Sequence, residues 1–202
     1  MGKTNGDDDL NDLLTEVRSR HPRFWEAVVA DARVNAAYRG ERSEFRSGGD
    51  ALMQVMRLTL RSDAFIGQVF YRAKASMQAR GIPVLPRLAH RLAIATAQVS
   101  IGDPVVVESG VYLVHGQVVI DGITEIGSGA VIAPFITIGL KAGNLRGPTL
   151  EPNVNIGTGA RILGSVRLGE GCVVGANAVV VEDVASGEVV VGVPARPLVT
   201  GR

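Results

Sequence analysis

The sequence has only one cysteine, Cys172, among its 202 residues. A single cysteine cannot form an internal disulfide, and it fits the reducing cytoplasm. Aromatic residues make up only 4% of the chain against 46% hydrophobic residues, so the core must be built from aliphatic side chains. The formal net charge is +1, which gives no electrostatic reason to expect a nucleic acid or a membrane surface as partner.

Long apolar runs are also absent. No segment approaches the roughly 20 apolar residues that a membrane-spanning helix requires. Residues 1–9 are polar and acidic and lack the apolar stretch of a secretory signal. We therefore expect a cytoplasmic protein with a frayed N-terminal tail.

What the sequence does contain is a six-residue repeat in its second half. Two consecutive hexads run from Ile126 to Thr137, and after a break the pattern resumes at Leu150 and continues to Val179. Each hexad opens with an aliphatic residue, usually has a small second residue, and places a small or β-branched residue fifth. Such a period is typical of hexapeptide β-helices, in which each coil buries its apolar face against its neighbours. Cys172 occupies a fifth position, so we expect a buried structural thiol there and not a nucleophile.

The chain changes character near Ser100. Upstream, apolar residues recur at helical spacing, which predicts a first helix carrying Leu10, Leu13, Leu14 and Val17. Further helices are expected from Pro22, over residues 50–80 and over residues 83–99, with a polar loop at residues 39–49.

Downstream of Ser100, glycine and β-branched residues dominate, and the solenoid is expected from Ile101 to about Val193. Residues 140–149 break the repeat and are predicted to form a loop, which in solenoids often marks the binding face. The chain thus divides into a helical N-terminal domain (1–99), a β-helix domain (100–196) and a C-terminal tail (197–202).

Four segments of the solenoid resemble the left-handed β-helix acyltransferases, and among them most closely the serine O-acetyltransferases. Residues 189–197 (VVVGVPARP) are similar to the closing turn of that family, and residues 156–164 (IGTGARILG) and 174–179 (VGANAV) to its acyl-CoA coils. Residues 113–120 (LVHGQVVI) are similar to the segment that carries the catalytic histidine. The resemblance covers roughly residues 100–196.

The resemblance implies a left-handed parallel β-helix preceded by a small helical domain, assembled as a homotrimer or as a dimer of trimers. It implies an acetyl-CoA-dependent O-acetyltransferase that uses no metal. The general base would be His115, the only one of the three histidines that lies in the solenoid. Histidine suits this task because it titrates near neutral pH.

The sequence departs from the family at the groups that support the base. The aspartate that orients the histidine corresponds to Ser100, and the aspartate just before the histidine corresponds to Val114. A second family histidine corresponds to Gly147, although the preceding Arg146 is retained. Ser100 would orient the imidazole more weakly than a carboxylate does, and Arg146 would clamp an acceptor carboxylate.

Further site residues follow from the same resemblance. Asp31 resembles a substrate-side aspartate in an early helix of the family. Small residues permit close approach of a ligand to the backbone, so they would accommodate the pantetheine arm of the coenzyme. The residues implied to bind acetyl-CoA are Gly139, Thr158, Ala160, Ala176 and, at a phosphate, Arg196.

The altered positions leave the acceptor open. We expect a small hydroxyl-bearing amino acid or an analogue, with poor turnover of free serine. The alternatives are a sugar or antibiotic O-acetyltransferase of the same superfamily and a catalytically impaired scaffold homologue. A γ-type carbonic anhydrase needs several histidines to hold zinc, and the solenoid has one. Family members bind a sulfhydrylase through a tail ending in isoleucine, so the end of this sequence, Leu198 to Arg202, argues against that partner.

Overall fold

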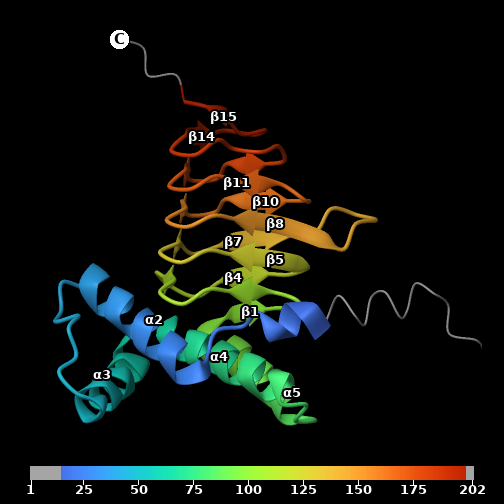
Figure 1. Ribbon diagram of the computed structural model, residues 1–202. Coiled ribbons are helices and arrows are strands. Elements are labelled where there is room, and N and C mark those ends of the chain that lie inside the picture. The colour runs from blue at the N-terminus through green and yellow to red at the C-terminus, as the bar shows by residue number, and fades with distance from the viewer. Residues whose placement is uncertain (1–14, 199–202) are drawn as a thin grey trace, which may run out of the picture.

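A helical base carries a tall column of short strands in the computed structural model, which describes residues 15–198 (Figure 1). Residues 15–19 are helical. The predicted helices are confirmed from residue 22 onward, and the segment expected over residues 50–80 is a pair of helices that breaks at residues 62–64. Of the predicted first helix, Leu10, Leu13 and Leu14 lie outside the described residues. The helices of the base are α2 (Phe24–Tyr38), α3 (Gly48–Arg61), α4 (Phe65–Ala79) and α5 (Leu85–Ala97).

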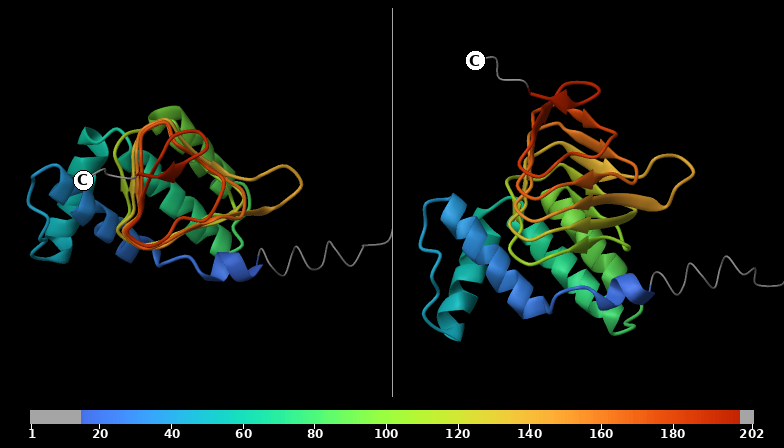
Figure 2. Two further views of the ribbon diagram at one scale, coloured as in Figure 1. Left: turned by 90° about the horizontal axis from the view of Figure 1, so that it is seen from above. Right: turned by 45° about the horizontal axis from the view of Figure 1, so that its top comes forward.

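The column is a parallel β-helix with three sides. Seen from above, its coils trace a triangle (Figure 2), because successive strands pass from one sheet to the next. Sheet A has the order β1-β4-β7-β10-β13, sheet B β11-β8-β5-β2, and sheet C β15-β14-β12-β9-β6-β3. All pairs are parallel except β14 with β15, which is antiparallel. The strands are β1 (Val99–Ile101), β2 (Val106–Val107), β3 (Tyr112–Leu113), β4 (Val118–Ile120), β5 (Ile123–Ile126), β6 (Val131–Ile132), β7 (Ile136–Gly139), β8 (Arg146–Leu150), β9 (Asn155–Ile156), β10 (Arg161–Leu163), β11 (Arg167–Leu168), β12 (Val173–Val174), β13 (Val179–Val180), β14 (Val189–Val191) and β15 (Arg196–Pro197).

The core of the column follows from the hexad. Its first and fifth positions point inward and stack from coil to coil, as Ile132, Ile156 and Val174 do at 0% exposure. Cys172, at a fifth position, is confirmed as a buried thiol. Burial is the main reason that its pKa is raised to about 11, so the sulfur is a packing group and not a nucleophile at neutral pH.

The prediction of a loop over residues 140–149 is wrong for the second half of that segment. Residues 146–150 form β8, which pairs with β5 and β11 in sheet B. Gly147, Pro148 and Leu150 are buried there, so this stretch belongs to the coil despite its glycine and proline. Only residues 140–145 leave the column, as the loop that projects between β7 and β8 (Figure 1).

Helix α4 closes the lower end of the column. The first coil has no coil beneath it, so its backbone carbonyl groups need other donors. Four side chains of α4 supply them. The donations run from Gln68 Nε2 to Val111 O (2.8 Å), from Tyr71 Oη to Val105 O (2.8 Å), from Arg72 to Val107 O and to Glu108 O (2.7 Å), and from Lys74 Nζ to Ile101 O (2.6 Å) and Gly102 O (2.9 Å).

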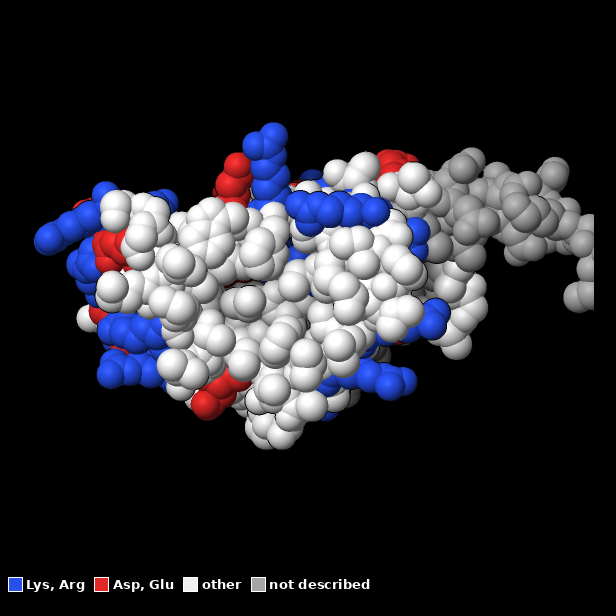
Figure 3. All heavy atoms as spheres, turned by 90° about the horizontal axis from the view of Figure 1, so that it is seen from below, with Lys and Arg blue, Asp and Glu red and all other residues white. Residues whose placement is uncertain are grey.

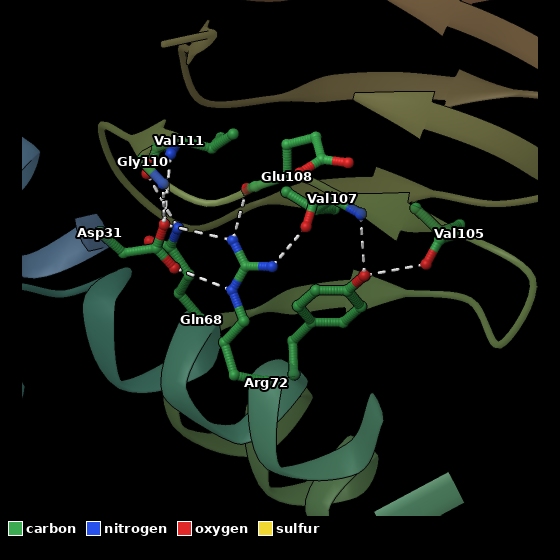
Figure 4. A network of polar contacts seen from close by, with 9 residues as sticks. Asp31, Gln68, Arg72, Val105, Val107, Glu108, Gly110 and Val111 are labelled. Atoms are coloured by element: carbon green, nitrogen blue, oxygen red, sulfur yellow. Dashed lines mark hydrogen bonds and ion pairs between the residues drawn. The ribbon is translucent and has the colours of Figure 1, made fainter. Parts of the chain in front are cut away.

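Asp31 of α2 completes this cap (Figure 4). Its Oδ2 accepts from Arg72 Nε at 2.9 Å, and its Oδ1 accepts from Arg72 Nη2 at 3.2 Å. Oδ1 also accepts from the backbone N–H groups of Gly110 at 2.8 Å and Val111 at 3.2 Å. The pair is almost fully buried, with 0% of the Asp31 side chain and 2% of the Arg72 side chain exposed. Two helices and the first coil are therefore joined by one charged network.

Viewed from below, the base shows a largely uncharged surface with Lys and Arg around its edge (Figure 3). Apolar side chains project from two of its helices. On α3, 54% of Met56 and 87% of Leu60 are exposed, and the exposed apolar residues of these helices are Leu52, Met53, Met56 and Leu60 on α3 and Leu85, Leu88, Leu92 and Ile94 on α5.

Candidate active site

The corner between sheets C and A repeats in every coil and carries the candidate base. In successive coils the turn from sheet C to sheet A contains one residue in the left-handed backbone region: Gln117, Phe135, Gly159 and Asn177. Backbone hydrogen bonds keep these turns in register, for example from Asn177 N–H to Thr158 O at 2.8 Å. The result is a vertical column of equivalent turns, which we call the C–A corner.

His115 lies in the lowest turn of the C–A corner, between β3 and β4. The next residue, Gly116, approaches the end of α5 so closely that an added Cβ would stand 1.9 Å from Ala97 O. Only glycine fits at this contact, which fixes the turn against the helical base. His115 opens into a cleft of about 330 Å³, and 58% of its side chain is exposed. The cleft is lined by Asp63, Ala95, Thr96, Ala97, Gln98, His115, Gly116 and Gln117.

Asp63 is the charged partner of the candidate base. Its Oδ2 lies 3.4 Å from His115 Nδ1. Asp63 belongs to the short connection between α3 and α4, far upstream of the solenoid. Sequence reasoning missed it because nothing in the residues around it marks this aspartate, and only the packing of α4 and α5 under the first coil brings it to the corner.

Ser100 does not take the orienting role. It lies in β1, where it pairs with Val119 of β4, and no hydrogen bond joins it to His115 among the residues that the structure describes. Ser100 instead lines a neighbouring cleft of about 390 Å³ on sheet A, together with Phe135, Thr137 and Arg161.

Arg161 is a second residue that sequence reasoning missed. In sheet A its strand partner is Thr137 of β7, and it lies directly beside the C–A corner. Its Nη1 donates to Phe135 O at 2.6 Å and Gly159 O at 2.7 Å. A guanidinium held in this way places a fixed positive charge at the sheet A cleft, beside the C–A corner.

The residues predicted to contact acetyl-CoA fall into two groups. Thr158 and Ala176 are exposed and occupy equivalent places in neighbouring turns of the C–A corner, above Gly116. Ala160 is 0% exposed and packs in the core, because it holds an inward-facing fifth position, so its side chain faces away from any external ligand. Gly139 lies at the end of β7, away from the C–A corner, and a Cβ added there would meet only Asp121 O at 3.9 Å.

The remaining predicted residues lie away from His115 within one chain. Arg146 is exposed at the start of β8, on the corner between sheets A and B, and its N–H donates to Asn144 Oδ1 at 2.9 Å. At Gly147 an added Cβ would stand 2.1 Å from Thr124 Oγ1, so this backbone has no room for the family's histidine. Asp31 is committed to the buried cap.

Arg196, at the start of β15, pairs with Glu182 at 3.1 Å. Both of these side chains are more than half exposed, so the guanidinium is reachable from solvent. Two other findings concern residues 15–198 alone: they include no group of three or more His, Cys, Asp or Glu side chains placed to hold a metal ion, and no helix in that range has the length and apolar character to cross a membrane.

Comparison with known proteins places this geometry in a family. The family model "Bacterial transferase hexapeptide (six repeats)" matches residues 147–181. A serine acetyltransferase of Synechococcus elongatus is 36% identical over 135 residues, which cover 65% of this chain and 55% of that protein. A serine acetyltransferase of Helicobacter pylori is 32% identical over 136 residues, which cover 65% of this chain and 79% of that protein.

The chain belongs to the serine acetyltransferase family. The solved structure of soybean serine acetyltransferase complexed with serine has a TM-score of 0.73 and 28% identity, covering 93% of this chain and 74% of that chain. These matches confirm the predicted resemblance and the left-handed β-helix fold. The chain spans about half the length of the first curated relatives that it matches, 55% and 52%.

Proposed function

We propose that this protein is an acetyl-CoA-dependent O-acetyltransferase that transfers an acetyl group to the hydroxyl of a small amino acid, with His115 as general base. The observation that carries the proposal is the position of His115 in an open cleft, at the foot of the column of turns that forms the C–A corner, in a member of the serine acetyltransferase family. The same fold in soybean serine acetyltransferase was solved with serine bound.

The reaction needs one proton acceptor and one thioester. Unprotonated Nε2 of His115 takes the hydroxyl proton as the acceptor oxygen attacks the thioester carbonyl carbon. The tetrahedral intermediate then breaks its carbon–sulfur bond. The departing sulfur takes the proton from the imidazolium, so that the products are the O-acetyl ester and free coenzyme A, with His115 returned to its starting state.

The C–A corner offers a track for the long donor. Neighbouring parallel strands lie about 4.8 Å apart. Thr158 and Ala176 stand two and three coils above Gly116, so they lie roughly 10 and 14 Å along the groove. An extended pantetheine arm spans such a distance, with its thioester near His115 and its nucleotide toward the upper coils, where Arg196 is exposed.

The site is completed by a second subunit in this proposal. Arg146 lies at the start of β8, on the corner between sheets A and B, whereas His115 lies between β3 and β4, on the C–A corner. The loop that precedes Arg146 projects from one corner of the triangular column (Figure 2). Neighbouring columns of a homotrimer bring one corner of a subunit toward another corner of the next. Arg146 would then bind the acceptor carboxylate from across the interface.

The proposed acceptor specificity rests on two positions that lack the polar side chains of the family. With Gly147 buried and Val114 apolar, neither position provides a polar side chain for the acceptor ammonium. We therefore propose that free serine is a poor acceptor compared with a related hydroxyl-bearing amino acid.

The test is release of free thiol from acetyl-CoA in the presence of serine, homoserine, other hydroxy amino acids and sugars. His115→Ala should lower kcat by about a hundred- to ten-thousandfold, the usual contribution of a positioned base, and should leave the affinity for acetyl-CoA unchanged. Full activity of that variant would refute the mechanism, and preference for a sugar would refute the acceptor class.

Mixing subunits tests the shared site. His115→Ala and Arg146→Ala proteins, each impaired alone, should regain activity when unfolded and refolded together, because some mixed trimers contain one intact site. Refolding each variant by itself is the control. Mixtures with no activity above these controls would place both residues outside a common site.

A further inference from the structure

We propose that Asp63 is the positioning residue for His115, replacing the orienting carboxylate that the sequence lacks at Ser100 and Val114. The inference builds on the proposed function, in which His115 is the base, and adds a residue from the helical part of the chain. Its starting observation is the distance of 3.4 Å between Asp63 Oδ2 and His115 Nδ1.

The atom that Asp63 faces determines its effect on the base. A neutral imidazole carries one proton, and the nitrogen that holds it is chosen by the hydrogen-bond partner. A carboxylate beside Nδ1 favours the proton there, which leaves the lone pair on Nε2 for the acceptor hydroxyl. When Nε2 receives the proton, the same carboxylate faces the new imidazolium charge.

No other acidic group stands in for this contact. Within residues 15–198, Asp63 is the only carboxylate within ion-pair distance of His115. Ser100 points into the sheet A cleft, and Val114 has no polar atom in its side chain. Without Asp63 the imidazole would be held only by the turn that carries it.

The surroundings of Asp63 fix its position although its own side chain is 79% exposed. On one side, Ser62 is 7% exposed, and its Oγ accepts from Asn35 Nδ2 at 3.2 Å. On the other side, Ala64 is 0% exposed and packs into the core of the β-helix. An aspartate between two anchored residues is presented to the corner in a defined direction.

The contact is longer than an ideal hydrogen bond of about 2.9 Å, and both side chains face solvent. Hydrogen bonds at catalytic groups often shorten only when the substrate is bound. We therefore expect an effect well below that of a buried His–Asp pair. Carboxylates that orient metal-bound histidines contribute about ten- to a hundredfold to activity, and we expect a loss of the same order here.

The first measurement is steady-state kinetics on the full chain. Asp63→Ala should lower kcat about ten- to a hundredfold with the KM for acetyl-CoA unchanged, and Asp63→Glu should recover most of that loss because it restores the carboxylate. Glu44→Gln, which removes an exposed carboxylate from the loop before α3, is the matched control and should behave as wild type. Wild-type kcat in Asp63→Ala would overturn the proposal, and so would a raised acceptor KM with unchanged kcat, which would mean that Asp63 holds the acceptor.

The second measurement does not depend on turnover. Nitrogen-15 NMR of the imidazole distinguishes a proton on Nδ1 from one on Nε2. Neutral His115 should carry its proton mainly on Nδ1 in the wild type and shift toward Nε2–H in Asp63→Ala, with His21 and His90 as internal references. An unchanged tautomer overturns the positioning role. If the wild type acetylates no acceptor, the proposed function fails, and the tautomer shift still decides whether Asp63 positions the ring.

Discussion

Replacing Arg72 by methionine tests how the β-helix is capped. The change keeps most of the side-chain volume but leaves the Asp31 carboxylate buried with only the Gly110 and Val111 N–H groups as donors. It also removes the donors to Val107 O and Glu108 O. Breaking a buried ion pair by removing one partner costs about 3–5 kcal/mol, and each orphaned carbonyl adds to this cost.

A loss of at least 3 kcal/mol is large against the 5–15 kcal/mol by which native domains are usually stable. With a urea m-value of about 3 kcal/mol/M or less, the unfolding midpoint should fall by roughly 1 M or more. Urea unfolding followed by circular dichroism, at one fixed protein concentration, measures this shift. Arg80→Met is the control, because Arg80 lies exposed at the end of the same helix and bonds only within it. Its effect should stay within about 0.5 kcal/mol.

A double variant distinguishes the stability that comes from the Asp31–Arg72 ion pair from the stability that comes from its hydrogen bonds to the backbone of the first coil. Replacing buried ion pairs by apolar residues is often neutral or stabilising. Asp31→Leu with Arg72→Met should nevertheless remain destabilised, because both side chains also satisfy backbone groups of the first coil. A double variant as stable as the wild type would show that the two charges serve only each other. A loss below 1 kcal/mol in Arg72→Met alone would refute the capping argument.

Two further predictions concern pH and coenzyme binding. His21 packs edge-on to Tyr71 with ring centroids 6.2 Å apart, and burial, with Arg72 and Lys74 nearby, lowers its pKa to about 4. Between pH 6.5 and 4 the unfolded chain therefore binds a proton at His21 that the folded chain does not bind. The free energy of unfolding has its full value above pH 6.5 and decreases as the pH falls toward 4. Allowing for partial exposure, His21→Phe should reduce the loss of stability between pH 7.5 and pH 4.5 by about 1–2 kcal/mol. Urea unfolding midpoints at the two pH values measure this loss. An equal loss of stability in the variant and the wild type would contradict the prediction. Ala176→Trp should weaken acetyl-CoA binding at least tenfold in calorimetry by blocking the C–A corner, whereas unchanged affinity would place the groove elsewhere.

The sequence predicted the column well because its signal is local and repeated. The hexad places aliphatic residues at the inward positions, and the structure buries them. The same rule should have excluded Ala160 from the ligand groove, since it holds the fifth position that correctly placed Cys172 in the core. The error over β8 has another origin, because Gly147 and Pro148 are residues typical of turns, whereas pairing with β5 and β11 determines their conformation.

The candidate site was predicted only in its solenoid half. His115, Thr158 and Ala176 belong to the repeat, so their relation along the corner follows from counting residues. Asp63 and the α4 cap depend on how the helices dock beneath the first coil, which no periodicity encodes. The polar residues Gln68, Arg72 and Lys74 within α4 were a signal that its buried face meets a polar surface, yet the carbonyl groups of the first coil could be identified only in the structure.

The helical base therefore has two connected roles in the proposed enzyme. Through α4 it satisfies the open backbone of the first coil, and through the connection before α4 it presents Asp63 to the lowest turn of the C–A corner. Ala64, which packs in the core of the β-helix, links the two roles because it is the N-cap residue of α4 and directly follows Asp63. A change that loosens the cap should consequently disturb the base as well. We therefore expect Arg72→Met to lower kcat by a larger factor than it lowers the affinity for acetyl-CoA, because the proposed contacts of acetyl-CoA lie higher on the column.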